Sequence, residues 1–84
     1  MGEYFITFRS VTLAQRGEGL LKRKGIHCQL QRTPRWMEQQ GCGYCLRMRR
    51  SEIETCVRLL REGKVEFRKV YRQTGEGGVE EVVL

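Results

Sequence analysis

A strand followed at once by a helix is encoded in residues 44–60, which read YCLRMRRSEIETCVRLL. Over residues 44–48 the side chains alternate in character, as they do in a strand whose two faces have different surroundings. One face carries Tyr44, Leu46 and Met48, and the other carries Cys45 and Arg47. This segment therefore predicts a strand with one apolar face and one face that combines a thiol with a cation.

From residue 51 onward the spacing is that of an amphipathic helix. Ser51 and Glu54 form a capping box, in which two side chains bond to the free backbone N–H groups at a helix start. The positions that follow at i, i+3, i+4 and i+7 are all apolar, namely Ile53, Cys56, Val57 and Leu60. Gly63 marks the end of the helix. We therefore expect a helix that buries this one face.

Similar signals lie on both sides of residues 44–60. Ser10 caps an earlier helix and Gly25 stops it, and a strand ends before Pro34 because proline cannot donate to a ladder. The predicted strands span Tyr4–Phe8, Ile26–Gln31, Tyr44–Met48 and Val65–Tyr71, and residues 35–43 form a loop. The order β-α-β-β-α-β predicts an α+β ferredoxin-like sandwich, a four-stranded antiparallel sheet with both helices on one face.

The chain length of 84 residues suits one domain, which we expect to span residues 1–72. Residues 73–84 follow as a flexible, glycine-rich tail with an apolar and acidic end, Val79–Leu84. That end is either disordered or adds a short strand to a sheet edge, in this chain or in a partner.

The chain is basic, with sixteen Lys and Arg, ten Glu and a net charge of +6. All sixteen cations but only seven of the Glu lie in residues 1–72. Such a surface attracts anions, which include nucleic acid, an acidic protein and a small oxyanion. No apolar run approaches the roughly 20 residues of a membrane span, and the first residues do not have the layout of a signal peptide. We therefore expect a cytoplasmic protein without a membrane partner.

The four cysteines, Cys28, Cys42, Cys45 and Cys56, stay reduced in a cytoplasm. Cys28 and Cys56 stand among apolar residues, so we expect both to pack in the core. Cys42 and Cys45 form a C-x-x-C pattern, which leaves a redox dithiol open as an alternative function. A zinc site would need two further ligands at suitable spacing, so we expect neither a metal nor another cofactor.

Cys42 differs from the other thiols because it lies in the predicted loop between two glycines, where a partner can approach closely. Three cations lie near it in sequence or across the expected strand connection, namely Arg32, Arg35 and Arg47. Cations stabilise a thiolate and lower the pKa of the thiol, which makes the sulfur a nucleophile. We therefore interpret Cys42 as the chemical centre and the three arginines as its electrostatic support.

Several segments together resemble the family of small selenium/sulfur carrier-like domains. Within about residues 4–72 they are Tyr4-Phe5-Ile6-Thr7-Phe8 with Ser10, then Ala14, Glu18 and Leu20-Leu21-Lys22, then Thr33-Pro34-Arg35, Gly41-Cys42-Gly43 and Leu46-Arg47. The resemblance implies that the cysteine before the second glycine, Cys42, holds a persulfide or perselenide. The chain departs from the family pattern at Cys45, where the family tends to have a small apolar residue. Whether Cys42 passes its sulfur on or forms a disulfide with Cys45 stays open.

The predicted site thus has Cys42 as nucleophile and carrier and Cys45 as a candidate resolving thiol. Its expected substrate-binding residues are Arg32, Thr33, Pro34, Arg35, Gly41, Gly43 and Arg47. One His and scattered Glu offer no acid–base pair, which favours a carrier over a turnover enzyme. The partners of such a carrier would be sulfur or selenium donor and acceptor proteins.

Two other functions fit parts of the sequence. The RNA-recognition motif has the same β-α-β-β-α-β order, and residues 40–47 keep both glycines and one aromatic of its third-strand signature. Cys42 and Arg47 replace two key aromatics, however, and Tyr44 shares a face with apolar residues. A nucleic-acid-binding module is therefore the less favoured alternative. An adaptor that forms a homodimer through the sheet or through Val79–Leu84 is another.

Overall fold

The structure is a computed structural model that describes residues 3–33, 43–74 and 78–83. Within these residues there are two α-helices, five strands and one 3₁₀ turn. In chain order they are β1 (Glu3–Phe8), α1 (Val11–Arg23), β2 (Cys28–Arg32), β3 (Tyr44–Arg49), η1 (Arg50–Glu52), α2 (Ile53–Glu62), β4 (Val70–Gln73) and β5 (Val79–Val82). The predicted α+β class is confirmed. In the described part of the chain, neither helix is long and apolar enough to cross a membrane.

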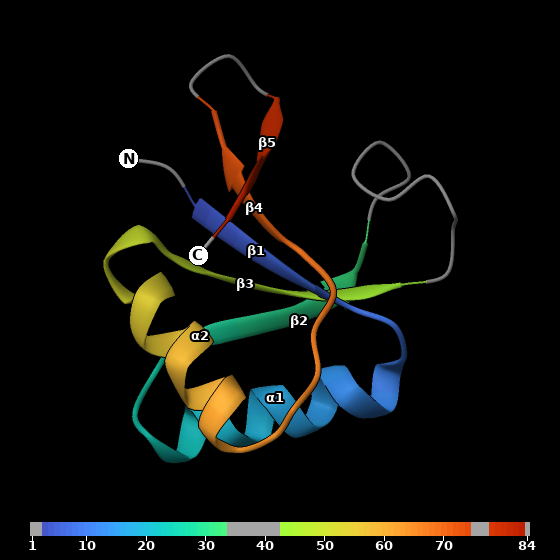
Figure 1. Cartoon of the computed structure of the whole chain (residues 1–84), viewed down its shortest axis with the longest axis vertical. Helices are drawn as coiled ribbons and strands as arrows, with labels where there is room; N and C mark the ends of the chain where they lie inside the picture. The colour runs from blue at the N-terminus through green and yellow to red at the C-terminus, as the bar shows by residue number, and fades with distance from the viewer. Residues whose placement is uncertain (1–2, 34–42, 75–77, 84) are drawn as a thin grey trace.

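The strands form one antiparallel sheet in the order β2-β3-β1-β4-β5, and both helices cover the same face of it (Figure 1). The predicted four-stranded ferredoxin-like sheet was wrong in the number of strands. The fifth strand, β5, comes from the end of the chain and pairs with β4 at a sheet edge. Thr74 and Gly78 join the two strands, because the Thr74 N–H donates to the Gly78 carbonyl at 2.9 Å.

The main core lies between the sheet and the helices. Alternation in β1 and β3 directs every second side chain toward the helices, and each helix contributes one face. Its completely buried members include Ile6, Phe8, Leu21, Leu46, Cys56 and Leu60. Tyr44 packs against this core, whereas Cys45 belongs to a small cluster on the other face of the sheet. The predicted faces of the strand and of the second helix are therefore confirmed.

The two helices begin differently. α1 begins as predicted, because the Ser10 hydroxyl accepts a hydrogen bond from the backbone N–H of Leu13 at 3.3 Å. The capping box predicted for the second helix was wrong. Ser51 lies inside the 3₁₀ turn η1, and Glu52 is the N-cap residue without a side-chain capping bond. The tighter turn takes the place of a side-chain cap at this helix end.

Two predicted strands have different limits in the structure. β2 begins at Cys28 rather than Ile26, because the Ile26 N–H bonds back to the Leu21 carbonyl of α1 at 3.0 Å. β4 begins at Val70 rather than Val65. The Val65 N–H bonds to the Leu60 carbonyl of α2 at 2.9 Å, and residues 65–69 form an irregular connection outside the strand.

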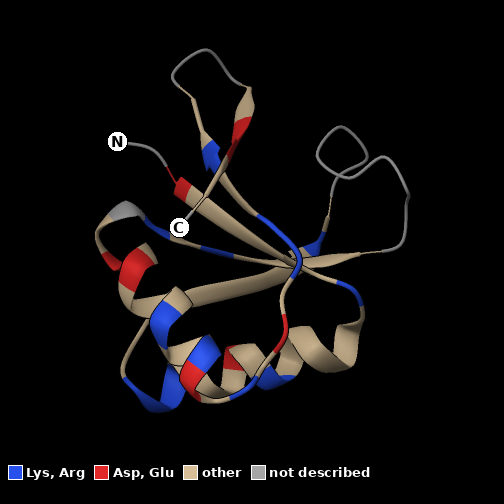
Figure 2. Ribbon diagram, in the orientation of Figure 1, with Lys and Arg blue, Asp and Glu red and all other residues tan. Residues whose placement is uncertain are grey.

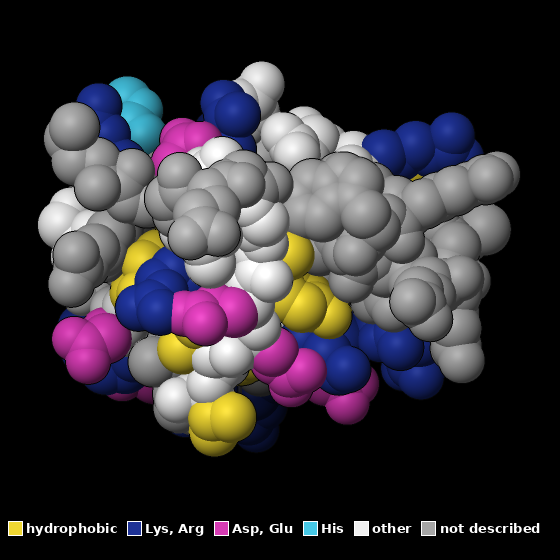
Figure 3. Space-filling view, turned by 90° about the horizontal axis from the view of Figure 1, so that it is seen from above, with side chains coloured by type: hydrophobic (Ala, Val, Ile, Leu, Met, Phe, Trp, Pro, Cys, Tyr) yellow, Lys and Arg dark blue, Asp and Glu magenta, His cyan; other side chains and the backbone are white. Residues whose placement is uncertain are grey.

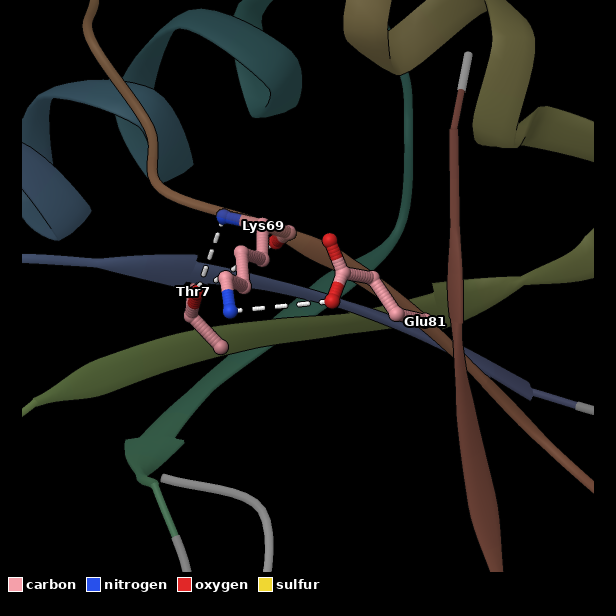
Figure 4. Close-up of polar contacts among 3 residues, drawn as sticks. All are labelled: Thr7, Lys69 and Glu81. Carbon is pink, nitrogen blue, oxygen red and sulfur yellow. Dashed lines mark hydrogen bonds and ion pairs between the residues drawn. The ribbon is translucent and has the colours of Figure 1, made fainter. Parts of the chain in front are cut away.

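A β-bulge joins this connection to β1. Thr7 faces two residues, because its carbonyl accepts from the Arg68 N–H at 2.7 Å and its N–H donates to the Lys69 carbonyl at 2.9 Å. The Thr7 hydroxyl accepts a hydrogen bond from the Lys69 N–H at 3.1 Å and donates to the Lys69 carbonyl at 3.3 Å. The Lys69 Nζ then lies 3.6 Å from a carboxylate oxygen of Glu81 in β5 (Figure 4). Buried Thr7 therefore holds the point at which the chain enters β4.

Replacing Thr7 with valine is expected to lower the free energy of unfolding by about 1–3 kcal/mol, because the isosteric side chain leaves the Lys69 N–H without its hydroxyl acceptor. Urea unfolding measures this change. Thr55→Val on the exposed face of α2 is the matched control and is expected to change stability by less than about 0.5 kcal/mol. Equal effects of the two substitutions would contradict a structural role for the Thr7 hydroxyl.

Candidate functional site

The predicted loop leaves the sheet at the end of β2 and returns at the start of β3. A hydrogen bond joins these two points, because the Thr33 N–H donates to the Gly43 carbonyl at 3.0 Å. Gly43 is buried, and a Cβ there would lie 3.3 Å from both the Phe8 carbonyl oxygen and the Thr33 hydroxyl oxygen. A side chain at this position would require the Phe8 carbonyl and the Thr33 hydroxyl to shift by a few tenths of an ångström. The sheet therefore holds Thr33 and Gly43 in fixed positions.

Five of the nine predicted site residues lie in the described part of the chain. These are Arg32, Thr33, Gly43, Cys45 and Arg47. The other four, Pro34, Arg35, Gly41 and Cys42, lie outside the described residues. Thr33, Gly43 and Cys45 come together at one end of the sheet.

Cys45 faces away from the helices and pairs in register with Thr7 of β1 and Gln31 of β2. Its side chain is 0% exposed and packs in a small cluster with Phe5. Burial raises the pKa of the Cys45 thiol, and the side chains of Thr33 and Gln31 and the charge of Arg47 lower it in part. Because the net shift is upward, Cys45 is a neutral thiol at neutral pH.

The hydroxyl of Thr33 is also buried at this point. Within the described residues it has no hydrogen bond of ordinary geometry, and the Cys45 thiol is the polar group that it approaches. Burying a hydroxyl without a partner costs about 1–3 kcal/mol. The end of the loop therefore combines a buried thiol with a buried hydroxyl that is poorly satisfied by the described part of the chain.

Arg47 lies on the same face as Cys45, two positions along β3. Its Nη2 donates to the side-chain oxygen of Gln29 at 2.7 Å, and its Nε lies 3.5 Å from a carboxylate oxygen of Glu3. These partners come from the strands on either side of β3. Arg47 therefore supplies a positioned positive charge that Glu3 partly neutralises.

Arg32 is not brought to the same face. It pairs in register with Tyr44, so its side chain leaves the backbone on the face of the sheet that the helices cover. The side chain is exposed at the end of β2. Of the three arginines predicted to support Cys42, Arg32 and Arg47 thus start from opposite faces of the sheet, and Arg35 lies outside the described residues.

Four contacts of this site were not predicted from the sequence. Thr7 and Gln31 lie beside Cys45, and Glu3 and Gln29 hold Arg47. Alternation in the sequence already indicates that Gln29 and Gln31 share one face of their strand. The signal that was missing is the register between strands, which places that face beside Cys45 and Arg47.

Cys28 and Cys56 contribute to the main core, as predicted. Burial raises the pKa of Cys28, as do Glu18 and Glu52, whereas Lys22 lowers it. Burial, with smaller effects of the Cys28 and Glu52 charges, raises the pKa of Cys56 to about 12. Both thiols are therefore weak nucleophiles at neutral pH.

Among the side chains that the structure describes, no three metal-binding residues are grouped as a metal site.

The side of the sheet away from the helices shows hydrophobic side chains in small areas between charged ones (Figure 3). In the described strands, its aromatic residues are buried Phe5 and partly buried Tyr71. The outward positions of β3 hold Cys45 and Arg47 instead, since Tyr44 packs on the helix side. RNA-recognition motifs stack bases on aromatics of this face, so the arrangement weakens the nucleic-acid alternative.

Comparison with known protein families shows the family of this chain. A family model described as "Putative Se/S carrier protein-like" matches residues 3–72. No curated protein sequence and no solved structure matches the chain. The matched range contains all nine predicted site residues, including Cys42. Because it covers well over half of the chain, this protein belongs to the Se/S carrier protein-like family.

Proposed function

We propose that the protein carries sulfur or selenium on Cys42 and passes it from a donor protein to an acceptor protein. In the loading step with sulfur, the Cys42 thiolate attacks the outer sulfur of a donor persulfide. A new S–S bond forms at Cys42, the S–S bond of the donor breaks, and its electron pair leaves on the donor thiolate. An acceptor thiolate then attacks the same outer sulfur and releases the Cys42 thiolate. Each step exchanges one S–S bond for another, so no net oxidation or reduction occurs.

The observation that carries this proposal is the family match over residues 3–72, which includes Cys42 and its flanking glycines. The chemistry of the other thiols supports the choice of Cys42. Burial is the main cause of a raised pKa at Cys28, Cys45 and Cys56, so thiolate formation is disfavoured at all three. They are therefore poor candidates for the carrier sulfur.

The surrounding residues have supporting roles in this proposal. Positive charge favours both the Cys42 thiolate and the persulfide anion. Arg47 provides such a charge from the face that carries Cys45, and Arg32 provides one from the end of β2. The remaining members of the proposed binding segment are Thr33, Pro34, Arg35, Gly41 and Gly43.

Cys45 is a slow resolving thiol in this proposal. If its thiolate attacked the inner sulfur of a Cys42 persulfide, a Cys42–Cys45 disulfide would form and hydrosulfide would leave. Complete burial and a raised pKa both disfavour this attack. The persulfide would therefore persist long enough to reach an acceptor, which separates a carrier from a dithiol oxidoreductase.

Iodoacetamide at neutral pH is expected to alkylate Cys42 at least about tenfold faster than the other three thiols, because one pKa unit changes the thiolate fraction about tenfold. Mass mapping of the modified peptides over time measures the order of reaction. In denaturant, where burial is lost, the rates of the four thiols should converge. The proposal of a reactive carrier thiol would be wrong if native Cys42 reacted no faster than Cys45 or Cys56.

A further inference from the structure

Three clefts meet at one aromatic side chain, Phe67, in the connection between α2 and β4. The first lies against Arg9 and Leu13, the second against the end of α2, and the third against β5. Phe67 is half-buried and packs against the main core. We define the Phe67 surface as this ring with the five cations that line the clefts, namely Arg9, Arg61, Lys64, Arg68 and Lys69.

The Phe67 surface is positively charged. Its five cations face two carboxylates, Glu66 and Glu81, along the same clefts. Cations lie at both ends of the α2–β4 connection, with an acidic position between them (Figure 2). The Arg9–Glu66 ion pair is long, at 3.9 Å, and its side chains are at least 75% exposed, so it stabilises the chain little. The charges of the residues that line the three clefts sum to +3, five cations against two carboxylates, which favours an anionic partner.

Lys64 occupies a backbone conformation that normally favours glycine. Its φ of 57° lies in the left-handed region, just after the end of α2. The glycine of this turn is instead Gly63, where a Cβ would lie only 2.7 Å from Leu20 Cδ2. A cation therefore occupies a helix-ending position that glycine would take with less strain.

The main chain beside Phe67 is open. Val65 and Arg68 donate backbone hydrogen bonds to Leu60 and Thr7, but Glu66 and Phe67 make no backbone–backbone hydrogen bond with any described residue. An extended segment of another protein can pair with such groups and place side chains in the neighbouring clefts. The geometry therefore suits a peptide.

Nucleic acid fits this surface less well. The guanidinium of Arg61 lies over the Phe67 ring, 5.9 Å from its centroid, so one ring face is already covered. Stacking of bases on open aromatic faces is a main source of affinity for single strands.

We propose that the Phe67 surface docks an extended acidic segment of a partner protein, with an apolar side chain of that segment between Phe67 and Leu13. The surface lies near the loop end, because Gly43 packs on the Phe8 carbonyl and Arg9 follows Phe8. A partner docked here is close to the point where the predicted Cys42 loop returns to the sheet. Because the docked partner would be the donor or the acceptor, this inference rests on the proposed carrier function.

Binding of a short fluorescent peptide that alternates Glu and Leu tests the inference on the full chain without a sulfur donor. Replacing both Arg9 and Lys64 with glutamine is expected to weaken binding about three- to tenfold. The matched control, Arg23→Gln with Arg49→Gln, removes the same charge from the end of α1 and from the far end of β3, and is expected to change affinity less than about twofold. Lys64→Gly is expected to weaken binding while the urea midpoint stays equal or rises, because it relieves the positive φ.

Equal weakening by the two glutamine pairs would overturn the inference, since it would indicate general charge attraction. Equal binding of a peptide with Gln in place of Glu, or no binding of the acidic peptide, would overturn it as well. Tighter binding of a single-stranded oligothymidylate with the same dependence on Arg9 and Lys64 would assign the surface to nucleic acid instead. If the peptide fails to bind but the protein still takes up sulfur, docking fails and the carrier function stands. The reverse result would retain the docking surface and reject the carrier.

Discussion

Replacement of Cys42 by alanine is expected to abolish the uptake of sulfur from a persulfide donor. Intact mass under non-reducing conditions would show the wild-type protein with the added mass of one sulfur atom, and Cys42→Ala without it. The expected loss is complete because burial raises the pKa of each remaining thiol. A thiol that stays protonated is a poor nucleophile toward the outer sulfur of a donor.

Cys28→Ala is the matched control for this experiment, because it also removes one thiol and leaves Cys42 in place. It is expected to take up sulfur like the wild type. Cys45→Ala is expected to hold the added sulfur at least as long, since it removes the slow resolving thiol. Sulfur uptake by Cys42→Ala would show that another thiol is the carrier. Formation of a Cys42–Cys45 disulfide in the wild type, with no persulfide detected, would favour the dithiol function instead.

The elements predicted most accurately are those whose burial imposes a period on the sequence. Residues 44–48 alternate because one face of β3 packs against the helices, and residues 53–60 follow helical spacing because α2 buries one face. The start of β4 follows no such local rule. It depends on the bulge at Thr7, whose hydroxyl bonds to a residue 62 positions away in the chain.

The fifth strand shows the same difficulty. Val79–Val82 is short and half acidic, and alone it favours neither a strand nor a disordered tail. In the structure its two carboxylates face cations of the preceding segment, with Glu80 against Arg72 and Glu81 against Lys69. The strand therefore depends on pairing with β4, which becomes evident only when the sheet is assembled.

The spatial arrangement of the candidate site could be predicted from the sequence only in part. Alternation placed Cys45 and Arg47 on one face of their strand, and the structure confirms this. Proximity in sequence also suggested that Arg32 and Arg47 act together, but they start from opposite faces of the sheet. The burial of Cys45 likewise depends on Phe5 and on the neighbouring strands, which are remote in the sequence.

Above about pH 9 the folded protein is expected to lose stability because of Cys56. Burial raises the pKa of this thiol from 9.0 to about 12. Between these values the unfolded chain releases the Cys56 proton and the folded chain retains it. The unfolded state then binds fewer protons, so the free energy of unfolding falls as pH rises. The contribution of Cys56 to the free energy of unfolding is fully present below pH 9 and is lost by about pH 12. Because the side chain is 0% exposed, we expect the loss to be about 2–4 kcal/mol.

Urea unfolding at a series of pH values, with a reductant present, compares the wild type with Cys56→Ala. The alanine variant is expected to be less stable at neutral pH, because it removes a buried sulfur, but to lose less stability as the pH rises. All other titratable groups are the same in both proteins, so their effect cancels in the difference. Cys28→Ala is expected to reduce the alkaline loss slightly, since the Cys28 charge is one cause of the raised Cys56 pKa. Identical alkaline losses in the wild type and Cys56→Ala would mean that Cys56 does not titrate with a raised pKa, and burial would then no longer explain its low reactivity.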